Sequence, residues 1–196
     1  MSDRSDFVIE DRRVRKTKQA LREGLAELLV EKNIQQITVK ELADKVDIHR
    51  STFYANFEDI SDLYNHMEDV AIEEISLIVS SSYVFEPRTF FEMLLVYISE
   101  NQQISHLFFG GRVSKTFHNR ITELFSDSYL DYLCGKYNLD RENEQLKYYE
   151  LFCFAGTLAV IEKWINGEIS YSNDELVKML VDIDNNWGSF VAEQFS

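Results

Sequence analysis

The stretch ITVKELADKVDIHRSTFYANF, residues 37–57, decides the fold of this chain. Thr38 stands three residues before Glu41, which is the spacing of a capping box at the start of a helix. Apolar residues then recur at helical spacing until Asp47 interrupts them, and a second short helix is predicted to begin near Ile48 or His49. Two short helices joined by a turn of three or four residues form a helix-turn-helix.

A longer helix is predicted before this pair, from Arg12 to about Lys32, because its leucines recur with a period of 3.6 residues. The two short helices of the helix-turn-helix are not stable alone in water, so this longer helix is expected to pack across them. Residues 12–22, RRVRKTKQALR, carry six basic side chains and no acidic one. This run is either a solvated helix face or a patch for a polyanionic partner.

The charge of the chain is uneven. Residues 1–60 hold 11 basic and 12 acidic residues, a net charge of −1, and residues 61–196 hold 9 and 22, a net charge of −13, which together give −14. A basic run at one end of an acidic protein fits a polyanion that binds at that end only.

The composition favours an all-α protein, since 196 residues contain only seven glycines and one proline. Further helices are expected from near Asp59 to somewhere in residues 80–83, from Pro87 through at least Ile98, near residues 104–109, 114–137 and 143–166, and from residue 173 onward. No segment predicts a strand. We expect a helix-turn-helix domain over residues 1–58 and a larger helical domain over residues 59–196, with the helix that begins near Asp59 leading from one into the other.

The second short helix offers a polar face. If Phe53 and Phe57 turn inward, the opposite face displays groups that can pair with guanine edges, meet a thymine methyl or bond to a phosphate. The alternative is an ordinary pair of core helices. With the capping residues and the basic run, the candidate DNA-binding residues are Arg12, Arg13, Lys16, Thr38, Lys40, His49, Arg50, Ser51, Thr52 and Tyr54.

Other chemistry has little support. The sequence contains no nucleophile elbow, no glycine-rich phosphate loop and no HExxH motif, and its four histidines are scattered. We therefore expect no enzyme activity, no cofactor and no metal. Cys134 and Cys153 are expected to be reduced core residues of a cytoplasmic protein. The longest apolar run, residues 151–161, is too short to span a membrane and predicts a helix buried on all sides.

Residues 16–63 resemble the DNA-binding domain of TetR-family transcriptional regulators, and the core of the likeness is ITVKELA followed by TFYANF. The resemblance implies an all-helical homodimer whose three N-terminal helices bind DNA and whose C-terminal domain holds an effector pocket and the dimer interface. It places phosphate contacts on Thr38 and Tyr54 and base contacts within residues 49–52. This chain departs from the family with Asp47 where glycine is usual and with Ile60 where lysine is frequent.

Residues 154–180, FAGTLAVIEKWINGEISYSNDELVKML, also resemble a subgroup that includes the regulators of dihydroxyacetone-kinase operons. Because the run 151–161 is too apolar for one helix face, part of it is expected to meet a second copy of the chain. The candidate dimer-interface residues are Leu158, Val160, Ile161, Leu180, Ile183 and Trp187.

The predicted function is a homodimeric repressor that binds a pseudo-palindromic double-stranded operator and responds to a small-molecule effector. The alternative is a coactivator on the same scaffold that docks a protein coregulator through its acidic C-terminal domain. No membrane partner is expected. The aromatic side chains that could line an effector cavity, or simply fill the core, are Phe85, Phe90, Phe91, Tyr97, Phe108, Phe109, Phe117, Phe125, Tyr129, Tyr148 and Phe152.

Overall fold

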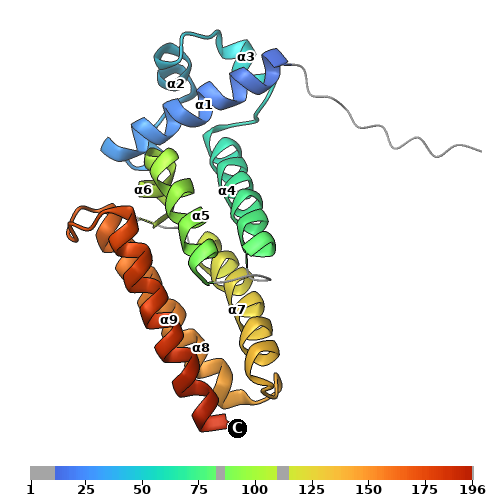
Figure 1. The fold of residues 1–196 in the computed structure, drawn as a ribbon. Helices are drawn as coiled ribbons and strands as arrows, with labels where there is room; N and C mark the ends of the chain where they lie inside the picture. Colours follow the sequence, from blue (N-terminus) through green and yellow to red (C-terminus); the bar gives the residue numbers. More distant parts are fainter. Residues whose placement is uncertain (1–11, 83–86, 110–114, 196) are drawn as a thin grey trace, which may run out of the picture. The chain divides into compact units, whose positions relative to one another are not determined.

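The computed structural model describes residues 12–82, 87–109 and 115–195, and within them it contains helices and connections but no strand (Figure 1). The all-α prediction is confirmed, and the described ends of the helices lie within a few residues of the expected ones. The elements are α1 (Arg12–Glu31), the short 3₁₀ helix η1 (Ile34–Gln36), α2 (Val39–Lys45), α3 (Arg50–Tyr54), α4 (Ile60–Ser82), α5 (Pro87–Glu100), α6 (Gln102–Phe109), α7 (Lys115–Tyr137), α8 (Glu144–Ile165) and α9 (Asn173–Phe195).

The chain divides into two compact units, and the division falls between Met67 and Glu68. The sequence placed it at residue 58, before α4. The observed division lies inside α4 because the first turns of this helix bury Ile60 and Leu63, together with Met67, whereas Ile75 and Val79 are buried further along the same helix. One continuous helix therefore belongs to both units.

The core of the first unit joins all three N-terminal helices. Leu21 and Leu25 of α1, Leu42 of α2 and Phe53 of α3 are fully buried. A side chain at Gly24 would bring its Cβ to 2.3 Å from Val46 Cγ1, so glycine allows α1 to lie this close to the end of α2. The ion pair between Lys45 Nζ and Glu27 Oε2, at 2.6 Å, fastens the same two helices.

The predicted start of α2 is confirmed in part. The Thr38 hydroxyl accepts a hydrogen bond from the Glu41 backbone N–H at 3.2 Å, which makes Thr38 the N-cap. The Glu41 carboxylate forms an ion pair with Lys32 rather than completing the capping box. The box was predicted from sequence spacing, which does not show that Lys32, the residue directly after α1, lies within reach.

The turn between α2 and α3 has the conformation that the resemblance implied for a glycine. Asp47 has φ of 53°, in the left-handed region that aspartate tolerates better than most residues. The next N–H, of Ile48, donates to the Ala43 carbonyl at 3.0 Å. This bond satisfies a carbonyl at the helix end in the manner of a Schellman motif and sets the direction in which α3 begins.

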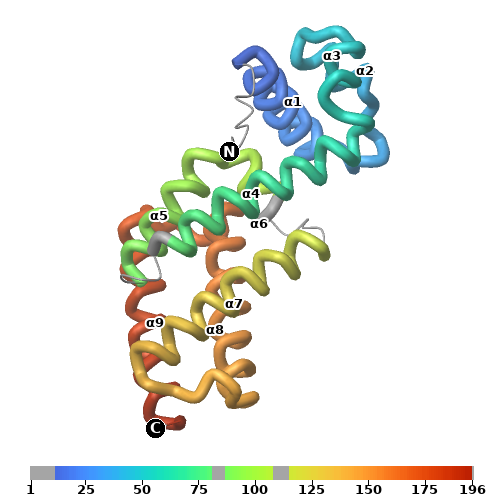
Figure 2. The backbone as a smooth tube through the Cα atoms, turned by 90° about the vertical axis from the view of Figure 1, so that its right-hand side faces the viewer, coloured from blue at the N-terminus to red at the C-terminus, as the bar shows by residue number. Residues whose placement is uncertain are grey.

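The second unit is a layered bundle in which α5 packs on α9 and α8 contacts α6, α7 and α9 (Figure 2). The expected inward face of α5 is confirmed, since each of its predicted apolar residues is buried: Phe90, Phe91, Leu94, Leu95 and Ile98. An ion pair of 2.7 Å between Arg120 and Asp69 links α7 to α4. The end of α8 also follows the prediction, because Gly167 after it has φ of 73°.

The expectation that residues 151–161 are buried on all sides is wrong for the single chain. Leu151 is 47% exposed and Phe152 is 71% exposed, and Ala155, Gly156 and Ala159 also lie on the surface. The three helices that contact α8 cover its other faces and leave this one open. An apolar run can therefore reflect a face that lacks a partner as well as a face inside the core.

None of the helices in the described ranges combines the length and the apolar character required to cross a membrane. Within the same ranges, no group of three or more His, Cys, Asp or Glu side chains is arranged to hold a metal ion.

Candidate nucleic-acid interface

Helix α3 is five residues long, and apolar side chains that pack into the core on one side fix its orientation. Phe53 is fully buried and Phe57 is 6% exposed, and their ring centroids lie 6.0 Å apart. Phe57 also packs against the His66 ring of α4, with 5.3 Å between the ring centroids. The prediction that these two phenylalanines face the core is confirmed, and the other side of α3 must then face outward.

That outward side carries the predicted base-reading residues. His49, at the N-cap, is exposed together with Arg50 and Ser51, while Thr52 is half-buried. Arg50 forms no ion pair with any residue that the structure describes, so its guanidinium keeps its five donors for a partner. Hydrogen bonds hold both ends of this short helix: the Thr52 N–H donates to the His49 carbonyl at 2.8 Å, and Asn56 Nδ2 donates to the Thr52 carbonyl at 2.7 Å.

Tyr54 lies beside this face with 58% of its surface exposed. Its ring meets Phe53 edge-on, with 5.5 Å between the centroids. Contact with a fully buried ring restricts the orientation of Tyr54 while its surface stays open to solvent. A hydroxyl held in this way is suited to donate to a phosphate oxygen.

The start of α2 adds two further groups. Thr38 and Lys40 are both exposed. The Thr38 oxygen already accepts the capping bond from Glu41, but the hydroxyl hydrogen is a separate donor. The position that the resemblance assigns to phosphate contact therefore keeps the chemistry that this role needs.

The first turns of α1 are exposed and strongly basic. Arg12, Arg13, Arg15 and Lys16 lie on the surface, and the first turn contains no acidic residue. Positive side chains at a helix N-terminus oppose the helix dipole, at a cost of about 0.3–1 kcal/mol each. These basic residues therefore destabilise the isolated helix, whereas their attraction to an anionic partner would offset that cost.

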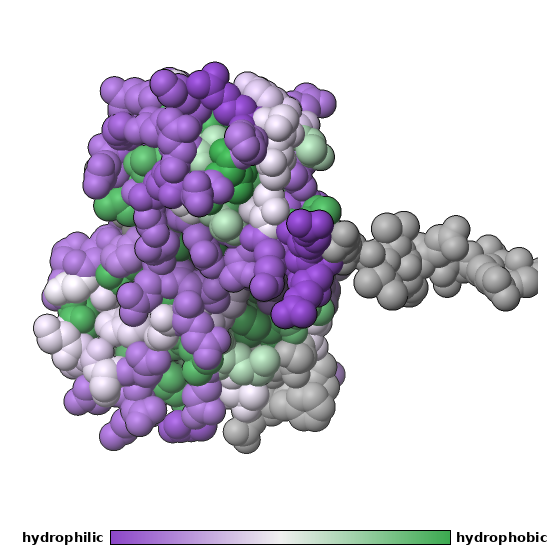
Figure 3. All heavy atoms as spheres, turned by 90° about the horizontal axis from the view of Figure 1, so that it is seen from above, coloured by the Kyte–Doolittle hydropathy of each residue, from purple (hydrophilic) through white to green (hydrophobic). Residues whose placement is uncertain are grey.

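All ten predicted DNA-binding residues lie in the first unit, and five of them are consecutive or nearly so at α3. Ile60, which stands where the family often has lysine, is 7% exposed and belongs to the core, so it offers no phosphate contact. Figure 3 shows a face of the molecule on which hydrophilic residues predominate and only small hydrophobic areas appear between them.

The predicted dimer-interface residues have different environments in the second unit. Ile161 and Leu180 are 3% and 1% exposed, so the chain buries both in its own core. Leu158, Val160 and Trp187 are half-buried, and Ile183 is 45% exposed. The largest exposed apolar side chains of α8 and α9, which the sequence did not select for this role, are Tyr148, Leu151, Phe152 and Phe190.

A two-helix DNA-reading motif braced by a third helix and followed by a helical bundle defines a class of DNA-binding transcriptional regulators. The family model described as "Transcriptional regulator C-terminal region" (TetR_C_8) matches residues 86–186 of this chain. The chain belongs to the TetR family of transcriptional regulators.

Solved structures share the fold. A TetR transcriptional regulator from Streptococcus agalactiae 2603V is 17% identical with a TM-score of 0.63, covering 89% of this chain and 97% of that chain. A TerR/AcrR-family regulator from Aquifex aeolicus VF5 is 15% identical with a TM-score of 0.67, covering 85% and 96%. The dihydroxyacetone kinase operon activator DhaS is 18% identical with a TM-score of 0.56, covering 92% and 98%. No curated protein matches the sequence.

Proposed function

We propose that this regulator is a homodimeric repressor that binds a pseudo-palindromic operator through α3 and releases it when a small molecule occupies the second unit. The observation that carries the DNA-binding part is the outward face of α3. Arg50 and Tyr54 are exposed there, while the buried Phe53 fixes the direction in which they point.

Sequence choice is assigned to residues 49–52. Arg50 can form two hydrogen bonds to the major-groove edge of a guanine, and the Thr52 methyl can contact a thymine. Helix α3 is short, so these adjacent positions reach few base pairs. A second copy of the helix is therefore needed for an operator of useful length, which agrees with a two-fold symmetric protein on a symmetric site.

Sequence-independent affinity is assigned to the groups around α3. Thr38 and Tyr54 supply hydroxyl donors to phosphates, and Lys40, Arg12 and Lys16 supply exposed charges. Each phosphate that a cation neutralises releases counterions, so operator affinity should fall steeply as salt concentration rises. Ile60 has no charge. The basic residues at the start of α1 therefore contribute a larger share of the electrostatic affinity than they would in a relative with lysine at the position of Ile60.

The dimer is assigned to the open face of α8, with the exposed apolar residues of α9 beside it. From Tyr148 to Ala159 every exposed position of α8 is apolar, and the exposed Lys147 and Lys163 flank the run. A Cβ added at Gly156 would meet no atom within 4 Å, so a partner helix can come close at this point. Two such faces related by a two-fold axis would form a four-helix bundle.

Control by a ligand requires that the ligand bind one state of the dimer better than the other. Helix α4 is the proposed link, since it runs without interruption through the division between the two units. A coupling of about 1–3 kcal/mol would change operator affinity roughly 5–150-fold. The coactivator alternative rests on the net acidity of the second unit, which by itself identifies no docking surface.

The test is selection of duplex DNA from a random pool, followed by affinity measurements on the selected sequence. Wild-type protein should enrich a pseudo-palindromic site. Arg50→Ala should lose about 1–3 kcal/mol of binding free energy and tolerate other bases at one position of each half-site. Tyr54→Phe should weaken all sequences alike.

Arg88→Ala is the matched control, because Arg88 is an exposed arginine of the second unit. It should leave operator affinity unchanged. A pool from which the wild-type protein enriches no sequence would refute the DNA-reading role of α3.

A further inference from the structure

A cavity of about 50 Å³ lies inside the second unit, between side chains of α5, α7, α8 and α9. Its volume leaves room for roughly three to five water-sized groups. Five aromatic side chains form much of the wall: Phe90, Phe91, Phe125, Tyr129 and Phe154. Four of these belong together through ring contacts, with centroid distances of 5.1 Å for Phe90–Phe91 and 5.4 Å for both Phe90–Phe125 and Phe125–Phe154.

Two carboxyl groups also line this aromatic cavity. Glu150 of α8 is 2% exposed and Asp184 of α9 is 7% exposed. Neither residue stood out in the sequence as a candidate for any site. Among the described residues that form the wall, none is lysine, arginine or histidine. The protein therefore brings two acidic groups into an apolar cavity without lining it with a basic one.

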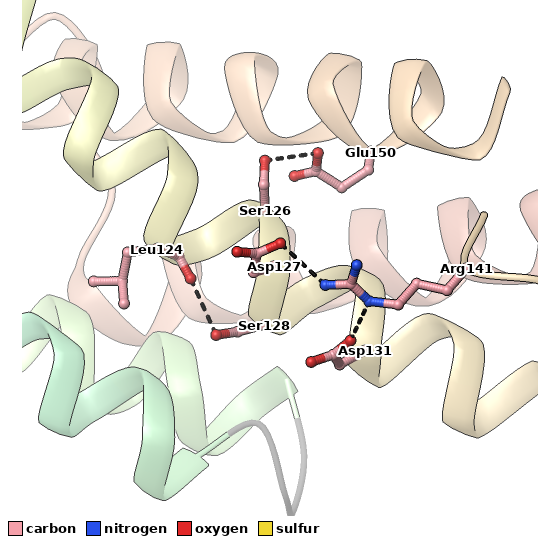
Figure 4. Close-up of polar contacts among 7 residues, drawn as sticks. All are labelled: Leu124, Ser126, Asp127, Ser128, Asp131, Arg141 and Glu150. Atoms are coloured by element: carbon pink, nitrogen blue, oxygen red, sulfur yellow. Dashed lines mark hydrogen bonds and ion pairs between the residues drawn. The ribbon is translucent and has the colours of Figure 1, made fainter. Parts of the chain in front are cut away.

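Glu150 is only half satisfied. Its Oε2 accepts a hydrogen bond from the Ser126 hydroxyl at 2.8 Å, whereas Oε1 is buried and accepts none from the residues that the structure describes (Figure 4). The guanidinium of Arg141, labelled in the same figure, donates hydrogen bonds to Asp127 at 3.0 Å and to Asp131 at 2.6 Å. A buried carboxylate oxygen without a donor is costly, so its position calls for a donor from outside the chain.

Asp184 lines the same cavity, and neighbouring groups offset part of the cost of burying its carboxyl group. Burial raises the pKa of its carboxyl group, and the nearby Tyr129 hydroxyl and the charge of Lys136 oppose the rise. Burial likewise raises the pKa of Glu150, and the Ser126 hydrogen bond opposes it. In both cases the loss of water outweighs the help that the protein supplies.

We propose that this cavity binds a small protonated amine, whose N–H groups donate to Glu150 Oε1 and Asp184 and whose alkyl groups lie against the aromatic rings. The single positive charge offsets part of the negative charge of the two carboxyl groups, and aromatic faces attract cations. An anion would be repelled, and a neutral alcohol could donate a hydrogen bond but would leave the charge uncompensated. The inference deepens the proposed function, since it names the chemical class of the effector.

The test uses matched probes of about the size of the cavity, namely butylammonium, n-butanol and butyrate, with binding measured by calorimetry on the full chain. Butylammonium should bind at least about tenfold more tightly than n-butanol, and butyrate should not bind. Tetramethylammonium, a cation that lacks N–H donors, should bind more weakly than trimethylammonium.

Variants assign the binding to this cavity. Glu150→Gln and Asp184→Asn keep the side-chain shapes and remove one charge each, so each should weaken butylammonium binding by at least about tenfold. Glu144→Gln, an exposed position of the same helix, is the control and should leave it unchanged. Circular dichroism establishes that each variant is folded before binding is compared.

Two outcomes would overturn the proposal: n-butanol binding as tightly as butylammonium, or Glu150→Gln and Asp184→Asn both binding butylammonium as tightly as the wild type. Operator affinity, measured separately with and without butylammonium, tests the effector role. If the amine binds but operator affinity is unchanged, ligand control through this site is refuted, while the cavity still stands as an amine-binding site. Loss of amine binding in a protein that still selects an operator would refute only the site.

Discussion

Asp47 shows how a single residue departs from the family pattern without changing the fold. With φ of 53° it adopts the backbone conformation for which glycine is usual at this turn. Aspartate reaches this region more easily than most residues because its short polar side chain can bond locally. The hydrogen bond from Ile48 to Ala43 then closes α2 as it would after a glycine. The implication drawn from the sequence is confirmed at this position.

Cys153 supports a prediction about reactivity. It lies in the wall of the aromatic cavity, where burial raises the pKa of its thiol to about 11. The thiolate is the reactive form, so at about pH 8 the native protein should react with iodoacetamide roughly 100-fold more slowly at Cys153 than the urea-unfolded chain does. Mass spectrometry of the alkylated peptides follows Cys153 and Cys134 separately. Equal rates in the native and unfolded protein would show that the thiol is not buried in this way.

At the scale of elements, the approach of α1 to the end of α2 depends on Gly24. Alanine favours a helix over glycine by about 1 kcal/mol, but its Cβ would lie 2.3 Å from Val46 Cγ1. Overpacking of a core costs about 1–3 kcal/mol, so Gly24→Ala should destabilise the protein by up to about 2 kcal/mol. Urea unfolding monitored by circular dichroism measures the change.

Gly135→Ala provides the matched control for Gly24, because Gly135 is an exposed glycine of α7 at which an added Cβ would meet no atom within 4 Å. It should stabilise the protein slightly. If both substitutions stabilise the protein, the close approach at Gly24 is not a constraint on the fold.

The open face of α8 supports a prediction about assembly. Phe152 is 71% exposed in the single chain, so Phe152→Glu should leave the protomer folded while placing a charge in the proposed dimer interface. A central aromatic residue of an interface contributes at least about 2 kcal/mol, which is roughly 30-fold in the dimer dissociation constant. Sedimentation velocity at micromolar concentration should show a wild-type dimer and a shift of the variant toward monomer.

Leu77→Glu serves as the comparison for Phe152→Glu, since Leu77 of α4 is 64% exposed and lies outside the proposed interface. It should remain dimeric. A wild-type protein that sediments as a folded monomer would contradict the assignment of the dimer to α8 and α9.

For the whole molecule, the two buried carboxyl groups predict how stability depends on pH. Burial raises the folded-state pKa of Glu150 and Asp184 above their ordinary values of 4.5 and 3.8. Between the ordinary and the raised values the folded protein binds more protons than the unfolded chain. Stability should therefore increase as pH falls through this window and stop increasing below the ordinary values.

Thermal unfolding at about pH 7.5 and about pH 5.5 measures this effect. The wild-type midpoint should rise at the lower pH, and the rise should be smaller in Glu150→Gln and in Asp184→Asn than in the exposed control Glu144→Gln. An equal rise in all four proteins would show that the gain comes from the general relief of negative charge, which is −14 for the chain, and not from the two buried groups.

The sequence by itself determined the elements and the DNA-reading motif, because these depend on neighbours along the chain. The spacing of apolar residues placed the helices, Thr38 marked the start of α2, and Phe53 with Phe57 marked the inner face of α3. Each of these signals spans one or two helical turns, so a linear pattern contains it completely.

Only the tertiary structure decided which apolar residues are covered and which acidic residues are buried. Ile161 and Leu180 resemble Leu151 and Phe152 in the sequence, yet the first two are in the core and the last two are on the surface. Glu150 and Asp184 are 34 positions apart, and only the packing of α8 and α9 around one cavity brings them to the same wall. Contacts between distant helices are set by the whole bundle, and no local pattern of residues records them.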